Sequence, residues 1–406
     1  MVVAVSSARE RQQVALPGLG YDGVVYIAAN GFSGTGSLLH DGRAILTAAH
    51  VVEQIETADD VAVLFETPAG AVWRQVAAVV LHPEYDADNL NNDLAILWLE
   101  SAAPANADRY DLYRDTDELT QAFTLVGYGN GGTGWNGEVD CTTCEPVRRY
   151  AENTFDATAT QLKNALGPIM AWDPRDYAQL VADFDDGTFD HDALGQLIGV
   201  YDLGVGVTEG IIAAGDSGGP ALIDHQVAGV ASYGMSLYTA WADPDIDSVT
   251  NSTFGEMAAW QRVSSNQQWI DQTLRARQME LGAPTSVDEI QFSIHEGDWG
   301  IDYVWFWVAY SGPWLDDDQP VSVQYRTVDG TARAGEDYVP VSGQLRFYPG
   351  DTGIPIAVEI IGDTLPEPDE TFYLEVYDPQ GGTFPGGVRS LSAVRTIIDD
   401  DGYWFG

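Results

Sequence analysis

One glycine-rich run, residues 215–220 (GDSGGP), contains a serine that could act as a nucleophile. A serine hydroxyl becomes a useful nucleophile only when a base removes its proton, and the oxyanion that forms needs preorganised donors. The glycines beside Ser217 allow a sharp turn and leave backbone N–H groups open to a substrate carbonyl. The run is weak evidence alone, so the chain must also supply a base and a group that orients it.

Two further runs supply those groups. Residues 46–50 (LTAAH) place His50 at the end of an apolar, strand-like segment. Residues 92–97 (NDLAIL) place Asp93 at the head of another. Because a histidine oriented by an aspartate can take the proton of a serine hydroxyl, the three residues form a candidate triad.

In this order, the three runs resemble the chymotrypsin/trypsin family of serine proteases. The resemblance covers most of residues 20–278 and includes the further runs GTGSLL, HPEY and VAGVASYG. It implies two β-barrels with a terminal helix, and catalysis that needs no cofactor. His50 would be general base and then acid, Asp93 would orient it, and Ser217 would attack. The N–H groups of Gly215 and Ser217 would form the oxyanion hole.

The resemblance also implies a substrate pocket. Ile211 stands six residues before the nucleophile, where trypsin has an aspartate, and the family's substrate-binding strand is matched by Ser232, Tyr233 and Gly234. An ionised side chain buried against Ile211 would have no partner, which is costly. We therefore expect apolar P1 residues to be preferred over lysine or arginine.

Some positions depart from the family pattern. Val51 and Ala213 stand where the family usually has cysteines, so we expect core packing rather than disulfides to hold the domain. No basic cleavage site precedes an Ile-Val-Gly-Gly start, and residues 21–25 (YDGVV) occupy about that place. The partner of Asp216 and the activation mechanism therefore stay open.

The C-terminal part has a different pattern, in which short alternating runs are separated by turn signals. Seven such runs predict an antiparallel β-sandwich: residues 291–295, 303–310, 321–327, 344–347, 354–361, 371–377 and 390–398. The phrases between and within them resemble the Calx-beta domain: VDGTA at 328–332, AGEDY at 334–338, FYPGD at 347–351 and IIDDD at 397–401.

Acidic residues gather at the ends of these predicted strands. Calcium takes six to eight oxygen ligands, many of them carboxylates. The residues that match the calcium ligands of the Calx-beta family are Glu296, Asp337, Asp363, Glu367, Glu370, Asp399, Asp400 and Asp401. Gly362 stands where the exchanger domains have a further aspartate, which would weaken one site. The alternative is a merely acidic, solvated end of the sandwich.

These patterns predict an all-β chain of two domains. The expected order is an N-terminal extension, a protease domain, a linker and a Calx-beta domain, at residues 1–19, 20–278, 279–285 and 286–406. The protease domain would carry an insertion at about residues 130–210 and helices at 160–166, 175–184 and 265–277. Residues 183–187 (DFDDG) are interpreted as a solvated turn rather than a metal site.

Composition narrows the class of partner. The chain has 406 residues, with 18 basic and 62 acidic ones, for a formal charge of −44. Such a charge would repel a phosphate backbone, so we expect no nucleic-acid partner. An acid-rich, lysine-poor chain suits saline surroundings, and a biased composition without that role is the alternative. No run is long enough to span a membrane.

The cysteine pair and the N-terminal residues leave two points open. Cys141 and Cys144 could form a local disulfide or remain two thiols. Residues 1–6 are too short and too soon polar for a signal peptide, so an exported protein would carry its signal outside this sequence.

The sequence predicts a secreted or cell-surface serine endopeptidase that acts on protein or peptide substrates. Its accessory domain would bind Ca²⁺. The alternatives are a catalytically weak or inactive homologue that serves in calcium-dependent adhesion, and an esterase. The oligomeric state stays open.

Overall fold

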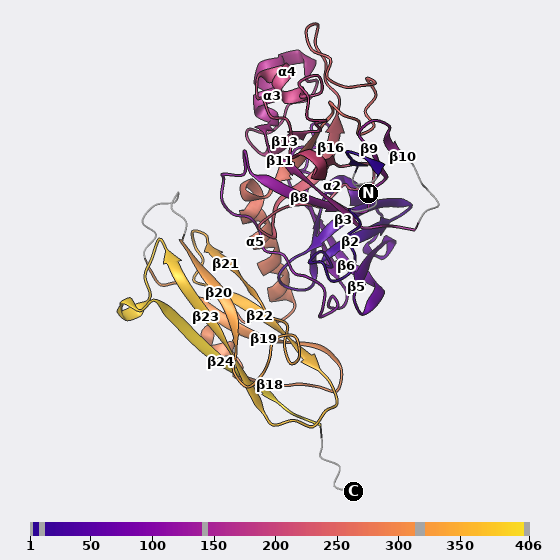
Figure 1. Ribbon diagram of the computed structural model, residues 1–406. Coiled ribbons are helices and arrows are strands. Elements are labelled where there is room, and N and C mark those ends of the chain that lie inside the picture. Colours follow the sequence, from indigo (N-terminus) through magenta and orange to yellow (C-terminus); the bar gives the residue numbers. More distant parts are fainter. Residues whose placement is uncertain (1–2, 8–12, 140–144, 313–320, 402–406) are drawn as a thin grey trace. The chain divides into compact units, whose positions relative to one another are not determined.

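A computed structural model describes residues 3–7, 13–139, 145–312 and 321–401, which form two compact units (Figure 1). As far as they are described, Met1–Leu39 and Arg43–Gln267 make up the first unit, and His40–Gly42 and Gln268–Gly406 the second. Cys141 and Cys144 lie outside the described residues. Within the described ranges, no helix has both the length and the apolar character needed to cross a membrane.

Six strands of the first unit close into a barrel. In barrel order they are β2 (Val24–Ala29), β3 (Phe32–Leu38), β4 (Ala44–Thr47), β7 (Ala95–Leu99), β6 (Gly70–Leu81) and β5 (Val61–Thr67). Buried and partly exposed residues alternate along β5, because successive side chains of a strand point to opposite faces. Every residue of β7 is buried.

A seven-stranded sheet forms the second half of this unit. Its order is β11 (Arg149–Thr154), β8 (Ala122–Gly127), β15 (Pro220–Ile223), β16 (Gln226–Met235), β17 (Met257–Arg262), β13 (Gln179–Asp183) and β12 (Ala157–Thr158). Its core includes three buried aromatic residues, Phe123, Phe155 and Trp260. The rings of Phe123 and Phe155 stack with their centroids 4.0 Å apart.

A small sheet and a few helices complete the first unit. The small sheet has the order β10 (Gly137–Val139), β9 (Gly131–Thr133), β1 (Val3–Ala4) and β14 (Gly210–Ile211). The helices are α2 (Ala49–Val52), α3 (Ala159–Leu166), α4 (Ala193–Ile198) and the start of α5 (Val263–Glu280). Across the described residues of both units, short 3-10 helices lie at Ala58–Asp60, Gly167–Ile169, Gly206–Thr208, Val287–Glu289 and Pro385–Gly387. α3 and α4 pack side by side through a shared apolar cluster (Figure 1).

Two of the three expected helices are confirmed, and one is wrong. α3 and α5 cover the segments predicted at 160–166 and 265–277. The segment predicted as a helix at 175–184 instead contains the strand β13, all of whose residues are buried. β13 pairs along its whole length with β17. This tertiary pairing overrides the local helix preference of the segment.

The second unit contains a β-sandwich, and all seven predicted strands are present. One sheet has the order β18 (Ser293–His295), β24 (Ser390–Ile398), β23 (Glu370–Gln380), β20 (Val321–Asp329) and β21 (Ser342–Phe347). The other pairs β19 (Gly300–Ala309) with β22 (Gly353–Gly362). Apolar residues of both sheets form one core between them. The predicted all-β class, with barrel-like sheets followed by a sandwich, is confirmed.

The predicted domain boundary after residue 278 falls inside α5, and the longer segment of the second unit begins within this helix at Gln268. At the other end of the chain, the predicted N-terminal extension contributes β1 to the small sheet of the first unit.

Candidate active site and carboxylate clusters

The candidate triad begins with His50, which lies in the short helix α2 directly after β4. Its Nδ1 lies 2.7 Å from Asp93 Oδ2, and its backbone N–H donates to Asp93 Oδ1 at 2.9 Å. An ionised carboxylate can only accept, so Nδ1 must carry the proton of a neutral imidazole. The lone pair of the ring is therefore left on Nε2. The imidazole side chain is 26% exposed and the carboxylate 0%.

Asp93 is held by groups that lie far away in the sequence. The hydroxyl of Ser232 donates to its Oδ2 at 2.5 Å, and the side-chain amide of Gln261 donates in turn to Ser232 Oγ at 3.3 Å. Ser232 lies at a bulge where the pairing of β16 with β17 shifts register. Ser232 was predicted only as a substrate-binding residue, and its role in orienting the aspartate was missed.

Two opposing effects act on the titration of His50. Burial lowers its pKa, whereas the hydrogen bond that its Nδ1–H donates to Asp93 and the charges of Asp93 and Glu53 raise it. The net result is a pKa above the ordinary value of 6.5. The imidazolium form is therefore stabilised beside Asp93, as a proton-accepting base requires.

The loop of Ser217 is held close to the chain that carries His50. Gly218 has a φ of +83°, and a Cβ added there would lie 2.9 Å from the backbone N of Ala48. The carbonyl of Ser217 accepts from the N–H of Thr35 at 2.8 Å. Only a glycine permits both this φ and this approach. The third member of the candidate triad is thus brought to the end of β4.

The predicted oxyanion-hole residues, Gly215 and Ser217, lie in a turn that hydrogen bonds hold in place. Gly215 has a φ of +96°, and its carbonyl accepts from the hydroxyl of Thr35 at 2.9 Å. The carboxylate of Asp216 between them accepts from the N–H groups of Gly129 and Ala213, at 2.8 and 2.9 Å. No acceptor among the described residues takes the N–H of Gly215 or Ser217.

The predicted pocket residues lie in different surroundings. Ile211 is 1% exposed and packs within the apolar core, whereas Gly234 is exposed. The phenol of Tyr233 donates to Gln179 Oε1 at 2.8 Å and accepts from the indole N–H of Trp172 at 3.0 Å. The Trp172 ring stands edge-on to Tyr233. The predicted insertion therefore contributes a tryptophan beside the predicted substrate-binding strand, a contact that its sequence position did not reveal.

Three of the predicted calcium ligands come together at one end of the sandwich. Carboxylate oxygens of Asp337, Glu367 and Glu370 lie within 4.8 Å of one another. Burial, with the charges of neighbouring acids, raises the pKa of Glu296 to about 7. Burial also raises the pKa of Glu370 to about 7, with a further contribution from Asp337. The acids are therefore close enough to repel one another.

The other predicted ligands surround this group. The charge of Asp363 acts on Glu296 and on Asp401. Asp399 accepts from the N–H of Glu367 at 3.2 Å. Asp400 accepts from the N–H of Gly297 at 2.9 Å, so one of its oxygens is used by the backbone.

Two further positions bear on this cluster. Burial raises the pKa of Asp401, and the charge of Asp298, a residue that was not predicted, adds to this rise together with the other acids. A Cβ at Gly362 would lie 2.4 Å from the carbonyl of Gly297, so the backbone leaves no room for the further aspartate there. The remaining donors are all carboxylate oxygens, which fit a hard cation such as Ca²⁺.

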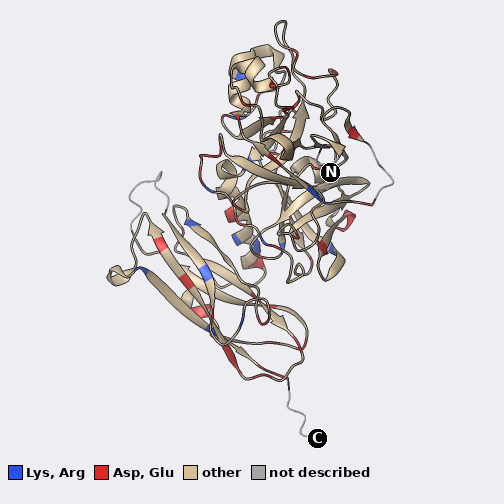
Figure 2. Ribbon diagram, viewed as in Figure 1, with Lys and Arg blue, Asp and Glu red and all other residues tan. Residues whose placement is uncertain are grey.

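The acidic residues spread over both units and are far more numerous than the basic ones (Figure 2). The expectation of a solvated turn at residues 183–187 is wrong for its aspartates 183 and 185, which are each 2% exposed. The backbone of Asp183 pairs with β17, and the N–H of Asp185 donates to Glu209. These bonds hold both aspartates inside the unit.

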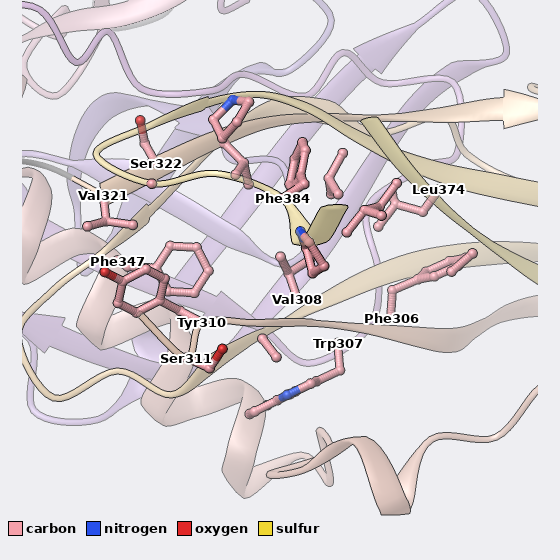
Figure 3. A pocket seen from close by; sticks show the side chains of 18 of the residues that line it. Phe306, Trp307, Val308, Tyr310, Ser311, Val321, Ser322, Phe347, Leu374 and Phe384 are labelled. Atoms are coloured by element: carbon pink, nitrogen blue, oxygen red, sulfur yellow. The ribbon is translucent and has the colours of Figure 1, made fainter. Parts of the chain in front are cut away.

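An apolar cavity of about 720 Å³ lies between the sheets of the sandwich (Figure 3). The rings of Tyr310 and Phe347 lie in its wall with centroids 5.7 Å apart. Arg395 also lines it, but its guanidinium donates to the carbonyl of Trp305 and lies 4.1 Å from the Phe306 ring.

Two protein families match separate parts of the chain. Residues 15–163 match the trypsin family and residues 292–401 match the Calx-beta domain family, which confirms the resemblance seen in the sequence. The trypsin match includes His50 and Asp93 and ends before Ser217. The assignment of Ser217 as the nucleophile therefore depends on its own sequence motif and on the geometry of its loop.

Individual relatives match over short stretches. Sodium/calcium exchanger 2 of Rattus norvegicus is 40% identical over 92 residues, which are 20% of this chain and 10% of the exchanger. Sodium/calcium exchanger Calx of Drosophila melanogaster is 41% identical over 80 residues, 20% of this chain and 8% of that protein. Adhesion G-protein coupled receptor V1 of Danio rerio is 52% identical over 78 residues, 19% of this chain and 1% of the receptor. The chain thus spans a tenth or less of these relatives.

Among solved structures, neuropsin, a serine protease expressed in the limbic system of mouse brain, is similar to the chain. The match has 16% identity and a TM-score of 0.46, and it covers 64% of this chain and 98% of neuropsin.

Proposed function

We propose that this chain, in which a trypsin-family domain precedes a Calx-beta domain, is a serine endopeptidase that cleaves peptide bonds through an acyl-enzyme. The observation that carries the proposal is the buried Asp93, whose two oxygens bind the ring and the backbone N–H of His50. Supporting it, the loop of Ser217 packs against the residues just before that histidine. General-base activation of a serine needs this kind of arrangement.

In the proposed reaction, Ser217 Oγ attacks the scissile carbonyl carbon while His50 Nε2 takes the hydroxyl proton. The electron pair of the C=O bond moves to the oxygen, which the N–H groups of Gly215 and Ser217 stabilise. Asp93 stays ionised and stabilises the imidazolium. His50 then gives the proton to the departing amide nitrogen as the C–N bond breaks. Water, deprotonated by His50, releases the acyl group and restores Ser217.

The substrate preference that we propose is for apolar P1 residues. The apolar Ile211 offers no counter-charge, and an ionised side chain buried without a partner costs several kcal/mol. Trp172 and Tyr233 add aromatic surface beside the exposed Gly234. A peptide library should therefore show leucine, phenylalanine or similar residues at P1, and a clear preference for arginine or lysine would contradict this assignment.

For the sandwich we propose calcium binding by the carboxylates around Asp337, Glu367 and Glu370. Calcium would neutralise the mutual repulsion of these acids and order the loops that carry them. The reaction at Ser217 needs no contribution from the ion.

We propose that the protein works outside the cell or at its surface. Extracellular calcium-binding modules function at millimolar calcium, and a carboxylate-rich surface is screened in saline surroundings. Detection of the active protein in culture medium of its natural host would support this location, and its retention inside the cells would contradict it.

The test of the function compares wild type with Ser217→Ala in the cleavage of a denatured protein. We expect kcat to fall by roughly 10⁶-fold, because the members of such a triad act as a unit. Ser33→Ala is the matched control, since Ser33 is an exposed serine of the adjoining strand β3. Cleavage by purified Ser217→Ala at the wild-type rate would refute the assignment.

A further inference from the structure

A second group of acids lies inside the first unit, whereas the predicted calcium ligands belong to the second. Asp183 ends β13, Asp185 follows two residues later, Asp192 precedes α4, and Glu209 precedes β14. Their exposed fractions are 2%, 2%, 1% and 0%. Carboxylates are rarely buried to this degree unless they are paired with a positive group or bind a metal.

Each of three carboxylates uses one oxygen to hold the local backbone. Asp183 Oδ2 accepts from the N–H of Leu194 at 2.7 Å, and Asp192 Oδ1 accepts from the N–H of Gly195 at 2.6 Å. Glu209 Oε1 accepts from the N–H of Asp185 at 2.7 Å. These bonds fix the carboxylates without neutralising them.

Three other oxygens of the group are buried without a partner. Asp185 Oδ1, Asp192 Oδ2 and Glu209 Oε2 accept no hydrogen bond within the described part of the chain. Oxygen atoms of Asp183, Asp185 and Asp192 also lie within 4.8 Å of one another. A buried acceptor that is left unsatisfied costs about 1–3 kcal/mol, and more when it is charged. Several such acceptors in one place indicate a missing positive ligand.

No basic side chain of the described ranges supplies that charge. None forms an ion pair with any of the four acids, and His191, next to Asp192 in the chain, lies 2.9 Å from Asp186 instead. Burial, with the charges of neighbouring acids, raises the pKa of Asp185 to about 10 and that of Glu209 to about 8. The cluster therefore concentrates negative charge that a cation would compensate.

We propose that the three aspartates of this cluster and Glu209 bind one calcium ion in the protease domain. The donors are all carboxylate oxygens, which favour a hard cation over zinc or copper. The backbone bonds already orient the carboxylates, so little reorganisation is needed on binding. The ion satisfies the three partnerless oxygens together.

The ion would join three segments that are distant in the sequence. It would tie the end of β13 to the start of α4 and to Glu209, two residues before Ile211. The side chain of Asn153 already donates to the carbonyls of Asp183 and Gly210, at 2.8 and 3.0 Å. Calcium at this place would therefore stabilise the insertion and the strand that leads to the nucleophile loop.

The test uses the full chain and calcium chloride, with Asp192→Asn as the first variant. Asparagine caps a helix as well as aspartate does, so its side-chain oxygen still accepts from Gly195. We expect calorimetry to show one calcium ion fewer per chain than in wild type. In EDTA, the variant should melt at the same temperature as wild type or higher, because the repulsion in the empty cluster is reduced.

Two controls separate this site from its surroundings. Asp190→Asn changes an exposed aspartate of the same loop and should bind calcium as wild type does. Glu370→Gln disturbs the sandwich cluster and should leave the ion of the protease domain bound. If Asp192→Asn does not fold, Asp185→Asn replaces it, since Asp185 Oδ1 holds no part of the backbone.

Unchanged calcium stoichiometry, with an unchanged calcium-dependent rise in melting temperature, in both Asp192→Asn and Asp185→Asn would overturn the proposal. A melting temperature of Asp192→Asn in EDTA well below that of wild type in EDTA would also overturn it, because the carboxylate would then be structural without a metal.

Discussion

Replacing Asp93 by asparagine tests how the structure fixes the proton on His50. The backbone N–H of His50 donates to Asp93 Oδ1 at 2.9 Å and cannot accept a hydrogen bond. An asparagine must therefore keep its oxygen at this position and place its NH₂ group where Oδ2 was. That point lies 2.7 Å from His50 Nδ1 and 2.5 Å from Ser232 Oγ.

The amide then donates to Nδ1, and the Ser232 hydroxyl can rotate to accept from it. The proton of the neutral imidazole moves to Nε2, which can no longer take the proton of Ser217. In the chymotrypsin-type triad, the equivalent aspartate-to-asparagine change lowers kcat by roughly 10⁴-fold. This corresponds to a rise of about 5 kcal/mol in the activation free energy, at 1.36 kcal/mol per tenfold. Because asparagine is isosteric, the fold should persist.

The assay is kcat/KM on a chromogenic peptide, with circular dichroism and the melting temperature as checks on the fold. Asp88→Asn is the matched control, because Asp88 is exposed and lies in the same loop before β7 as Asp93. A folded Asp93→Asn enzyme that loses less than tenfold in kcat/KM would refute the argument from the tautomer.

Three further predictions concern pH, stability and calcium. The pKa of His50 is raised above 6.5, and only the neutral ring can act as a base. We therefore expect kcat/KM to fall as the pH drops through a midpoint above 6.5. A midpoint below pH 6.5 would contradict the role assigned to His50. Arg148 forms a buried ion pair with Asp22 at 2.7 Å. Asp22→Ala would leave the guanidinium buried without this partner, so the free energy of unfolding in denaturant should fall by about 3–5 kcal/mol. Unchanged stability would contradict this prediction. Calcium at a hundredfold excess over Kd should raise the unfolding free energy of the sandwich by about 2.7 kcal/mol, as measured by calorimetry. Glu370→Gln should reduce this calcium-dependent stabilisation, whereas Asp378→Asn, at an exposed position, should leave it unchanged. Equal stabilisation in the two variants would count against the site.

The sequence predicted those parts of the fold that local pattern determines. The seven sandwich strands follow from alternation between turn signals, and the expected strands all occur. The segment 175–184 was mispredicted because the strand within it is a short buried run that only its pairing with β17 distinguishes from a helix.

The three triad motifs could be predicted from short runs of sequence. The side chains that hydrogen-bond to the triad could not be predicted in this way. Ser232 lies 139 positions from the aspartate to which it donates, and no spacing indicates that contact. The same holds for Asp183 and Asp185, which are hydrogen-bonded to α4 and to Glu209 further along the chain. A run of acids and glycine looks like a surface turn until those partners are known.

The most direct test of the central claim is labelling of the full chain with a fluorophosphonate, followed by mass spectrometry of the peptides. Such a reagent reacts with a serine whose hydroxyl is activated by a neighbouring base. We predict one adduct, on Ser217, which is lost in Ser217→Ala and strongly slowed in His50→Ala. No adduct on the folded wild-type protein, or an equal adduct in His50→Ala, would contradict the triad.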